Sequence, residues 1–327
     1  MNLAIIGCGL VGRKRALAAR NHRILWVADV DLERARSLAS EVSGARVTAD
    51  WRQVLDEPDV QAVIVATPHN LLAPITLQAL QAGKHVLVEK PGARSTAELE
   101  PVRKLAHDSR LVVKVGFNHR FHPALARAKR MIEEGVAGPL MFVRGLYGHG
   151  GRPGYEKEWR ADPRLSGGGE AIDQGIHLVD LARWMLGDFV QAVGYAPTCF
   201  WPMSVEDNCF MLLRTSSGQC AFLHASWTEW KNMFCFEIYG RKAKLRIDGL
   251  GGSYGTERLT FYRMLPQMGP PEIEVSEYPG PDASWANELQ NFVAAVEKGA
   301  PLCGDLDDAR AALRIVENIR RHRDAIG

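Results

Sequence analysis

The segment Gly7-Cys8-Gly9-Leu10-Val11-Gly12 constrains the fold of this chain more than any other feature. It follows an apolar run at residues 3–6 and precedes a helical pattern at residues 13–20. Gly7 permits a tight turn, Gly9 lets a pyrophosphate approach the backbone, and Gly12 allows close packing of helix on strand. The helix N-terminus then presents free N–H groups to the phosphates. A Gly-rich turn without a ligand is the alternative, but this context favours a dinucleotide site that also includes Leu10 and Val11.

Asp29 supplies the second part of the same pattern. It comes directly after the apolar run at residues 24–28 and lies 20 residues after Gly9. An acidic side chain at this position hydrogen-bonds the adenosine ribose hydroxyls and repels the 2′-phosphate of NADP. Although Arg34 is close in sequence, Asp29 favours NAD as the cofactor.

The first third of the chain has the rhythm of an α/β domain. Apolar runs at residues 3–6, 24–28, 62–66, 85–88 and 111–115 alternate with helical patterns, of which 71–82 and 96–108 are the clearest. Strands that are apolar throughout and separated by helices predict a parallel sheet covered on both faces. We therefore expect an N-terminal Rossmann domain, a doubly wound parallel sheet, at residues 1–117.

After Phe117 the rhythm changes. Helical patterns at 123–134 and 169–186 flank a strand at 141–147, and runs that alternate apolar with polar residues follow at 208–215, 219–227, 234–239 and 244–248. Ser216-Ser217-Gly218 predicts a hairpin turn between the first two of these runs. We expect a surface loop at 266–281 and closing helices at 284–298 and 305–325. The pattern predicts an α+β domain at residues 118–327 with a large, mostly antiparallel open sheet.

Composition excludes several classes of protein. The chain is 46% hydrophobic and 24% charged with a formal net charge of +2, which is typical of a globular protein and disfavours a nucleic-acid partner. No apolar run approaches the roughly 20 residues that span a bilayer. The basic cluster at residues 13–15 follows the apolar N-terminus, the reverse of a secretory signal. The six cysteines form no CxxC pair and have no zinc-ligand spacing, so we expect no metal and a reducing, cytoplasmic location.

Two further segments carry a resemblance to a known family. The first comprises Ala66-Thr67-Pro68 and, further along the chain, Glu89-Lys90-Pro91. The second is Gly167-Gly168-Gly169-Glu170-Ala171-Ile172-Asp173-Gln174-Gly175-Ile176-His177. Together with the glycine loop, they resemble the Gfo/Idh/MocA family, the glucose–fructose oxidoreductase and inositol dehydrogenase group, over nearly the whole chain.

The resemblance implies a two-domain enzyme that moves hydride between C4 of a nicotinamide and a carbinol carbon of a sugar, cyclitol or nucleotide sugar. It implies that Lys90 and His177 face the substrate with Asp173 beside them, and that the Lys90–Pro91 bond is cis. The cofactor-binding residues it adds are Ala66, Thr67, Pro68, Glu89, Lys90 and Asn118. One departure is that this chain has His69 and Leu72 where many members carry Asn and His.

The chemistry of alcohol oxidation fits three of these residues. Lys90 follows the strand at 85–89, at the carboxyl edge of the sheet, where its positive charge can stabilise a developing alkoxide. Asp173 and His177 are four residues apart on one helix face, and an imidazole is suited to accept the hydroxyl proton. We expect His177 to be the proton acceptor and Lys90 to position the oxygen. The alternatives are a surface lysine for Lys90 and an ordinary Asp–His pair for Asp173 and His177. The glycines at 167–169 disfavour the ordinary Asp–His pair, because they permit close backbone approach.

The loop at residues 149–160 and the segment after Phe117 complete the predicted site. Tyr155 and Trp159 suit the apolar face of a sugar ring, whereas Arg152, Lys157 and Arg160 suit an anionic substrate or merely solvate the loop. Arg120 and Asn118 are predicted pocket residues or structural hydrogen-bonding groups. The substrate-binding set is therefore Lys90, Arg120, Tyr155, Trp159, Arg160, Asp173 and His177.

Two other functions remain open. The first is a non-sugar diol dehydrogenase or reductase on the same scaffold, and the second is a non-catalytic NAD-sensing regulator. The alternating runs at 208–215 and 219–227 leave one sheet face to be covered, so we expect a homodimer or homotetramer through the C-terminal sheet.

Overall fold

The computed structural model describes residues 1–42 and 44–321, which form two compact units. The first unit comprises residues 1–118 and 285–310, and the second comprises residues 119–284 with 311 onward. The predicted boundary at residue 117 lies beside the first of these divisions, but the return of residues 285–310 to the first unit has no counterpart in the sequence pattern.

The first unit contains a six-stranded parallel sheet with the strand order β3-β2-β1-β4-β5-β6. Its strands are β1 (Asn2–Ile6), β2 (Arg23–Ala28), β3 (Arg46–Thr48), β4 (Ala62–Val65), β5 (His85–Glu89) and β6 (Val113–Gly116). The chain order reverses direction between β1 and β4, and in doubly wound sheets such a switch point is where ligands bind. The predicted Rossmann fold is confirmed.

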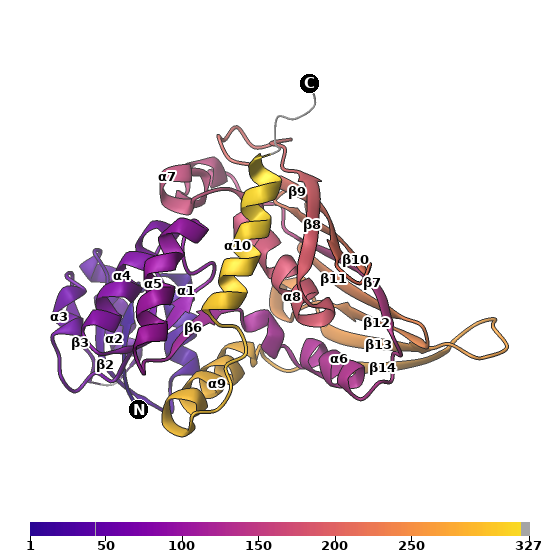
Figure 1. Ribbon diagram of the computed structural model, residues 1–327. Helices are drawn as coiled ribbons and strands as arrows, with labels where there is room; N and C mark the ends of the chain where they lie inside the picture. The colour runs from indigo at the N-terminus through magenta and orange to yellow at the C-terminus, as the bar shows by residue number, and fades with distance from the viewer. Residues whose placement is uncertain (43, 322–327) are drawn as a thin grey trace. The chain divides into compact units, whose positions relative to one another are not determined.

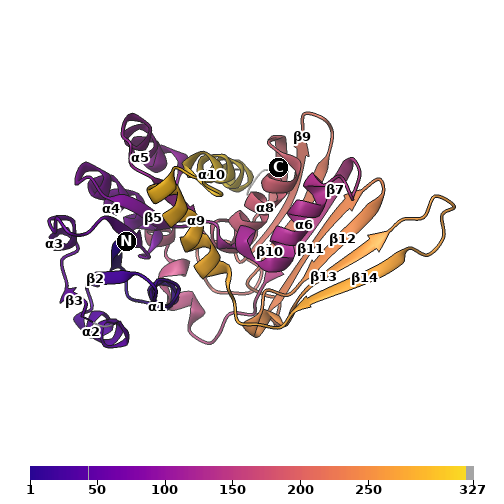
Figure 2. The ribbon, with the colours of Figure 1, turned by 90° about the horizontal axis from the view of Figure 1, so that it is seen from below.

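Helices cover both faces of this sheet. They are α1 (Leu10–Ala18), α2 (Leu32–Glu41), α3 (Arg52–Leu55), α4 (His69–Gln81), α5 (Thr96–Asp108) and α9 (Ser284–Lys298). Figure 2 shows α1 and α2 on one side of the sheet and α4 and α5 on the other. Leu289 and Phe292 of α9 join the core that β1, α1 and α2 share, and this buried apolar contact explains why α9 belongs to the first unit.

The second unit contains an eight-stranded sheet with the order β14-β13-β12-β11-β7-β10-β9-β8. Its strands are β7 (Leu140–Gly148), β8 (Phe189–Tyr195), β9 (Asn208–Thr215), β10 (Cys220–Ser226), β11 (Met233–Gly240), β12 (Ala243–Asp248), β13 (Glu257–Arg263) and β14 (Glu272–Tyr278). Neighbouring strands are antiparallel except β7 and β10. The mostly antiparallel sheet and the β9–β10 hairpin are as predicted.

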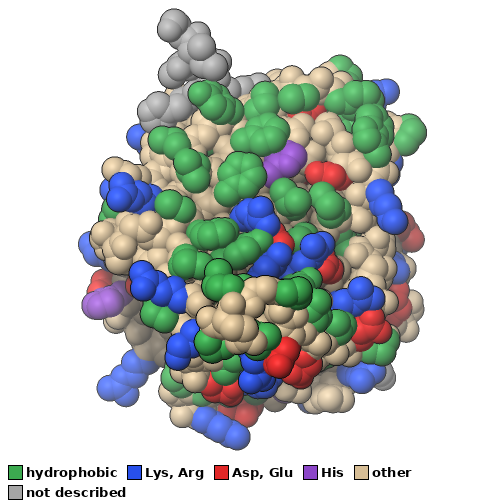
Figure 3. All heavy atoms as spheres, turned by 90° about the vertical axis from the view of Figure 1, so that its right-hand side faces the viewer, with side chains coloured by type: hydrophobic (Ala, Val, Ile, Leu, Met, Phe, Trp, Pro, Cys, Tyr) green, Lys and Arg blue, Asp and Glu red, His purple; other side chains and the backbone are tan. Residues whose placement is uncertain are grey.

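Helices lie on one face of this second sheet (Figure 1). Those labelled against this face are α6 (Pro123–Glu133) and α8 (Ile176–Leu186). The remaining helices are α7 (Pro163–Ser166) and α10 (Leu306–Arg321), with the short helices η1 (Asn118–Phe121), η2 (Tyr155–Lys157), η3 (Trp159–Ala161), η4 (Ala171–Gly175) and η5 (Gly252–Tyr254). Figure 3 shows the other face, where hydrophobic side chains gather among charged ones. None of the helices in residues 1–42 and 44–321 is long and apolar enough to cross a membrane.

Two predicted segments differ from the structure. The surface loop expected at 266–281 contains β14, which pairs with β13 from Glu257↔Tyr278 to Arg263↔Glu272. Pairing with a neighbouring strand outweighed the Pro and Gly residues at the segment's ends, and β14 lies at the edge of the sheet where such residues are tolerated. The last helix ends at Arg321, and the rest of its predicted range, 322–325, lies outside the described residues.

Candidate active site

The glycine loop of the first unit has the geometry of a phosphate cradle. Gly7 has a φ of 97°, and a Cβ there would lie 2.4 Å from the Ala66 carbonyl oxygen. A Cβ on Gly12 would lie 1.9 Å from the Gly7 carbonyl oxygen, so helix α1 packs this closely only on glycine. A Cβ on Gly9, in contrast, would meet nothing within 4 Å. Open space at Gly9, at the N-terminus of α1, fits a pyrophosphate.

Asp29 is tied to this loop. Its Oδ2 accepts a hydrogen bond from the Cys8 N–H at 2.8 Å, and its Oδ1 accepts one from the Asp31 N–H at 2.9 Å. Each carboxylate oxygen has a second lone pair. The half-buried carboxylate can therefore hold the glycine loop and still accept hydrogen bonds from ribose hydroxyls.

The segment after β4 lies against the same loop. Thr67 Oγ1 and Asn70 Oδ1 are buried atoms with no hydrogen-bond partner among the described residues. Buried polar atoms of this kind normally have a partner, and a cofactor bound at this edge would supply one. His69 and Leu72, where the chain departs from the family pattern, are 4% and 0% exposed.

Lys90 comes directly after β5, and its peptide bond to Pro91 is cis, as the resemblance implied. Glu89, predicted to contact the cofactor, directs its carboxylate at Arg15, whose Nε donates to Glu89 Oε1 at 2.6 Å. Arg15 also donates to Glu288 Oε2 at 2.6 Å. Sequence reasoning missed this buried trio, because the partners of Arg15 are 74 and 273 residues away.

Burial and the neighbouring charges act in opposite directions on the pKa of Glu89 and on that of Arg15. Burial raises the pKa of the Glu89 carboxyl against the opposing effect of Arg15, and the nearby Glu288 carboxylate raises it further. Burial disfavours the charged Arg15 guanidinium, but Glu89 and Glu288 outweigh it and raise the pKa of Arg15. The Lys90 backbone is thus joined to a strand end that a buried ion-pair network holds in place.

In the second unit, Asp173 and His177 lie on consecutive helical segments, η4 and α8. The first of these is a π-helix, an irregularity that often marks functional sites. Asp173 Oδ2 accepts a hydrogen bond from Arg160 Nε at 3.0 Å. Burial disfavours the Arg160 charge, but Asp173 prevails and raises the pKa of Arg160. His177 is 5% exposed, so the pair is not on a solvated helix face.

The glycines before η4 permit the close approach that we predicted. A Cβ on Gly169 would lie 1.9 Å from the Glu206 carbonyl oxygen. The same carbonyl accepts the Glu170 N–H at 2.9 Å, and Glu206 Oε1 accepts the Gly169 N–H at 3.0 Å. These contacts fix the start of the helical segment that carries Asp173 and His177.

Aromatic and polar groups surround His177. The His119 ring stacks on the His177 ring with centroids 3.8 Å apart, and Tyr147 lies edge-on at 6.3 Å. Gln174 Nε2 donates to the Tyr254 hydroxyl at 2.9 Å. Burial raises the pKa of Tyr147 well above its usual value, and Tyr254 adds to the shift. Sequence reasoning missed Tyr147 and Tyr254, which come from β7 and η5.

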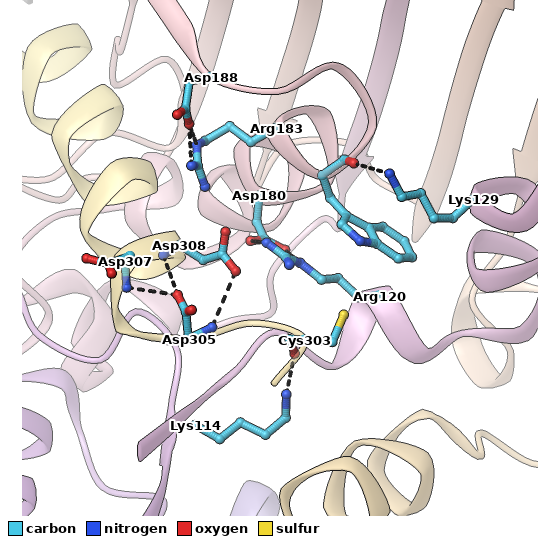
Figure 4. Close-up of polar contacts among 11 residues, drawn as sticks. Lys114, Arg120, Lys129, Asp180, Arg183, Asp188, Cys303, Asp305, Asp307 and Asp308 are labelled. Atoms are coloured by element: carbon cyan, nitrogen blue, oxygen red, sulfur yellow. Dashed lines mark hydrogen bonds and ion pairs between the residues drawn. The ribbon is translucent and has the colours of Figure 1, made fainter. Parts of the chain in front are cut away.

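The remaining predicted substrate residues differ in their surroundings. Tyr155 is 3% exposed and packs with Val205 and Trp227 in a small core, and burial raises the pKa of its hydroxyl. Trp159 is half-buried and lies under the Arg160 guanidinium at 4.6 Å. The Arg120 guanidinium binds Asp180 through two hydrogen bonds (Figure 4).

Asn118 is buried, at 5% exposure, at the end of the first unit's leading segment. Within the described residues, no three His, Cys, Asp or Glu side chains are grouped so as to hold a metal ion.

Comparisons with known proteins match both units. Residues 1–117 match the family model described as "Oxidoreductase family, NAD-binding Rossmann fold", and residues 125–246 match the "GFO/IDH/MocA C-terminal domain". The chain is 30% identical over 285 residues to levoglucosan dehydrogenase of Pseudarthrobacter phenanthrenivorans, covering 75% of this chain and 73% of the relative. It is 27% identical over 321 residues to scyllo-inositol 2-dehydrogenase (NAD(+)) of Bacillus subtilis, covering 93% and 89%.

Solved structures of dehydrogenases superpose on nearly the whole chain. A levoglucosan dehydrogenase in complex with NADH and L-sorbose superposes with a TM-score of 0.88 at 25% identity, covering 99% of this chain and 96% of the other. The complex of the same kind of enzyme with NADH and levoglucosan superposes with a TM-score of 0.89.

Proposed function

The chain belongs to the Gfo/Idh/MocA family of NAD-binding oxidoreductases, and from this premise we propose that it oxidises a carbinol carbon of a sugar, cyclitol or nucleotide sugar. The observation that carries the proposal is the buried acid–base group around His177, in a chain whose relatives include levoglucosan and inositol dehydrogenases. A protein that only bound NAD would not require a buried histidine four residues after an ion-paired aspartate.

The residues divide the chemistry between them. NAD, held at the glycine loop and Asp29, supplies the hydride acceptor. His177 accepts the hydroxyl proton of the substrate, since a neutral imidazole is a suitable base near pH 7. Lys90 donates a hydrogen bond to the same oxygen and stabilises its developing negative charge. Asp173 holds Arg160 in position, and the two give the substrate pocket a fixed pair of polar groups.

Trp159 and Arg160 extend the proposed substrate pocket. The indole of Trp159 is half-buried beneath the Arg160 guanidinium, an arrangement that leaves an aromatic surface beside a cation. Aromatic rings pack against the apolar faces of sugars, and a guanidinium binds hydroxyl or carboxylate groups. We propose that these two side chains contact the substrate, and that Tyr155 supports them from the core beneath.

The test compares His177→Asn with His224→Asn, a histidine of β10 that hydrogen-bonds Asn208 in the same unit. Reduced-cofactor absorbance would be followed with NAD⁺ and a panel containing levoglucosan, myo-inositol, scyllo-inositol and simple non-sugar diols. We expect turnover of a sugar or cyclitol, a loss of kcat of roughly 10²- to 10⁴-fold in His177→Asn, and an unchanged His224→Asn. NAD affinity, measured by titration calorimetry, should stay within about twofold in both variants, since neither belongs to the cofactor site.

The other outcomes select the alternatives. Turnover confined to non-sugar diols would favour a diol dehydrogenase, and tight NAD binding without turnover on any substrate would favour a regulator. Unchanged turnover in His177→Asn would remove the residue from the role of proton acceptor.

We also propose a homo-oligomer assembled through the second sheet, in the cytoplasm. The proposal is supported by large apolar side chains on the uncovered face, among them Phe210 (37% exposed), Leu212 (49%) and Phe222 (48%). Contiguous apolar surface of this kind is commonly covered by a partner. The six cysteines are all free thiols, which suits a reducing compartment.

A further inference from the structure

Three histidine rings follow one another inside the second unit. The His177 and His119 rings are stacked with centroids 3.8 Å apart and planes 24° from parallel. His122 meets His119 edge-on with centroids 5.6 Å apart, and its Nδ1 lies 3.0 Å from Glu257 Oε2. The three rings are 5%, 5% and 2% exposed, counting from His177. Only His177 has a role in the chemistry proposed above.

A buried ion pair fixes the two segments that carry the stacked His119 and His177 rings. Arg120, next to His119, donates from Nε to Asp180 Oδ2 at 2.9 Å and from a terminal nitrogen to Oδ1 at 2.6 Å. Asp180 lies three residues after His177 on α8, so it lies on the same side of the helix. Figure 4 shows the two side chains joined between η1 and α8. Two planar groups with paired hydrogen bonds permit little rotation, so the neighbouring rings are held face to face.

The remaining groups around the stack come from several elements. Tyr147 of β7 is tilted against His119 at 5.2 Å and approaches Tyr254 of η5 at 5.4 Å. Burial raises the pKa of Tyr254 to about 12 and that of Tyr147 well above its usual value, so both hydroxyls stay neutral near pH 7. The apolar ring of Phe234 in β11 packs edge-on against His119, with ring centroids 6.0 Å apart.

The charged groups near the stack are largely paired. Asp173 of η4 binds Arg160, and Asp180 of α8 binds Arg120. On the His122 side, Glu257 of β13 also accepts the Ala124 N–H at 2.6 Å, and Asp282 lies 3.9 Å from His122 Nε2. Glu170, before η4, is a fully buried carboxyl that contributes to the raised pKa of Tyr147. The His177 ring face therefore lies against another titratable group, the His119 imidazole.

Stacked imidazoles this close cannot both be protonated without strong repulsion, so their titrations are coupled. A neutral ring, in contrast, attracts a cation placed over its face. When His177 takes up the substrate proton, a neutral His119 stabilises the imidazolium, and the new charge keeps His119 neutral.

We propose that His119 is a positioning residue whose ring face holds and stabilises the His177 imidazole, and that the two rings bind a single proton between them in the working pH range. The proposal rests on the proposed role of His177 as proton acceptor.

The kinetic test compares His119→Ala with His119→Phe at pH 8. Alanine removes the stack, and we expect kcat to fall roughly 10- to 100-fold with KM changed by less than about threefold. Phenylalanine keeps an aromatic face against His177 and should restore kcat to within about fivefold of wild type. His224→Ala is the matched control, since His224 stacks on Phe210 at 4.2 Å in the same unit. Equal losses in the alanine and phenylalanine variants, or no loss in either, would overturn the positioning role.

The second test needs no substrate. Histidine-labelled protein without cofactor would be titrated by NMR, with His177→Asn and His119→Phe serving to assign the two rings. In the wild type we expect two coupled steps, the second at least about one pH unit below the first, and in His119→Phe a single step for His177. Two independent single steps in the wild type would refute the shared proton. Because this readout does not depend on turnover, a failure of the proposed dehydrogenase activity would leave its result intact.

Discussion

The Asp29 carboxylate has two tasks within the cofactor site. One is structural, because its oxygens accept the N–H groups of Cys8 in the glycine loop and of Asp31 before α2. The other, which we propose, is recognition of the ribose, for which its remaining lone pairs and its charge are suited. Burial and the Asp29 charge also raise the pKa of the Cys8 thiol to about 12, so this cysteine stays protonated and packs as an apolar group.

Replacing Asp29 by Ala should therefore weaken NAD binding and relax the discrimination against NADP. A hydrogen bond to a charged group contributes about 1.5–3 kcal/mol, so we expect NAD affinity to fall roughly 10- to 100-fold while NADP affinity falls less. Dissociation constants for both cofactors, measured by titration calorimetry, check this. Glu33→Gln, at an exposed neighbouring position, is the control. An unchanged ratio of the two constants would show that Asp29 does not set the preference.

The buried trio of Arg15, Glu89 and Glu288 connects three elements of the first unit: α1, β5 and α9. The Arg15 side chain is 0% exposed and lies over the Trp285 ring at 4.5 Å. A buried guanidinium between two carboxylates is costly to desolvate, but removing it leaves both carboxylates uncompensated, which is costlier. The trio therefore ties α9, which returns from the far end of the chain, to the strand that precedes Lys90.

Arg15→Met should lower the free energy of unfolding of the first unit by about 3–5 kcal/mol at pH 7. Because the Glu89 pKa is raised in the folded state, protonated Glu89 favours folding at low pH, and this contribution is lost as pH rises through the folded pKa. Without Arg15 the pKa of Glu89 in the folded state is raised further. The loss of free energy of unfolding in Arg15→Met should therefore be smaller at pH 5 than at pH 8. Urea unfolding at the two pH values measures it.

The matched control is Arg13→Met, whose ion pair with Glu41 is exposed and should contribute less than about 1 kcal/mol. A deficit for Arg15→Met that is the same at pH 5 and pH 8 would contradict the assignment of the loss to uncompensated carboxylates.

At the scale of the whole molecule, the uncovered face of the second sheet exposes large apolar side chains. Along β9, the side chains alternate between buried and exposed, and the exposed ones include Phe210 and Leu212. A charged group lies on the same face, where Glu237 binds Arg144 at 2.7 Å and Lys244 at 2.5 Å. A mixed surface of apolar side chains and paired charges is typical of a subunit interface.

The double variant Phe210→Glu, Leu212→Lys should reduce the mass of the assembly in solution, because it places two charges in the proposed interface. Multi-angle light scattering after gel filtration measures the mass. Leu17→Glu, at a position 68% exposed on α1, should leave it unchanged. A monomeric wild type, or a double variant with the wild-type mass, would reject assembly through this face.

Features that depend on a short stretch of chain were predictable from the sequence alone. The glycine loop, Asp29 and the helix Thr96–Asp108 follow from local backbone geometry and from the periodicity of apolar residues, which neighbouring residues determine among themselves. The hairpin between β9 and β10 is of the same kind, because its turn residues adjoin both strands.

Only the tertiary structure decided which distant segments meet. The return of α9 to the first unit, the partners of Arg15 and the stack of His119 on His177 all join residues far apart in the chain. Periodicity shows that a side chain is buried, but its partner is determined by packing and charge compensation over the whole unit. The sequence by itself therefore determined that a dinucleotide-binding fold begins at the glycine loop, and the tertiary contacts decided how its charged and aromatic side chains are held.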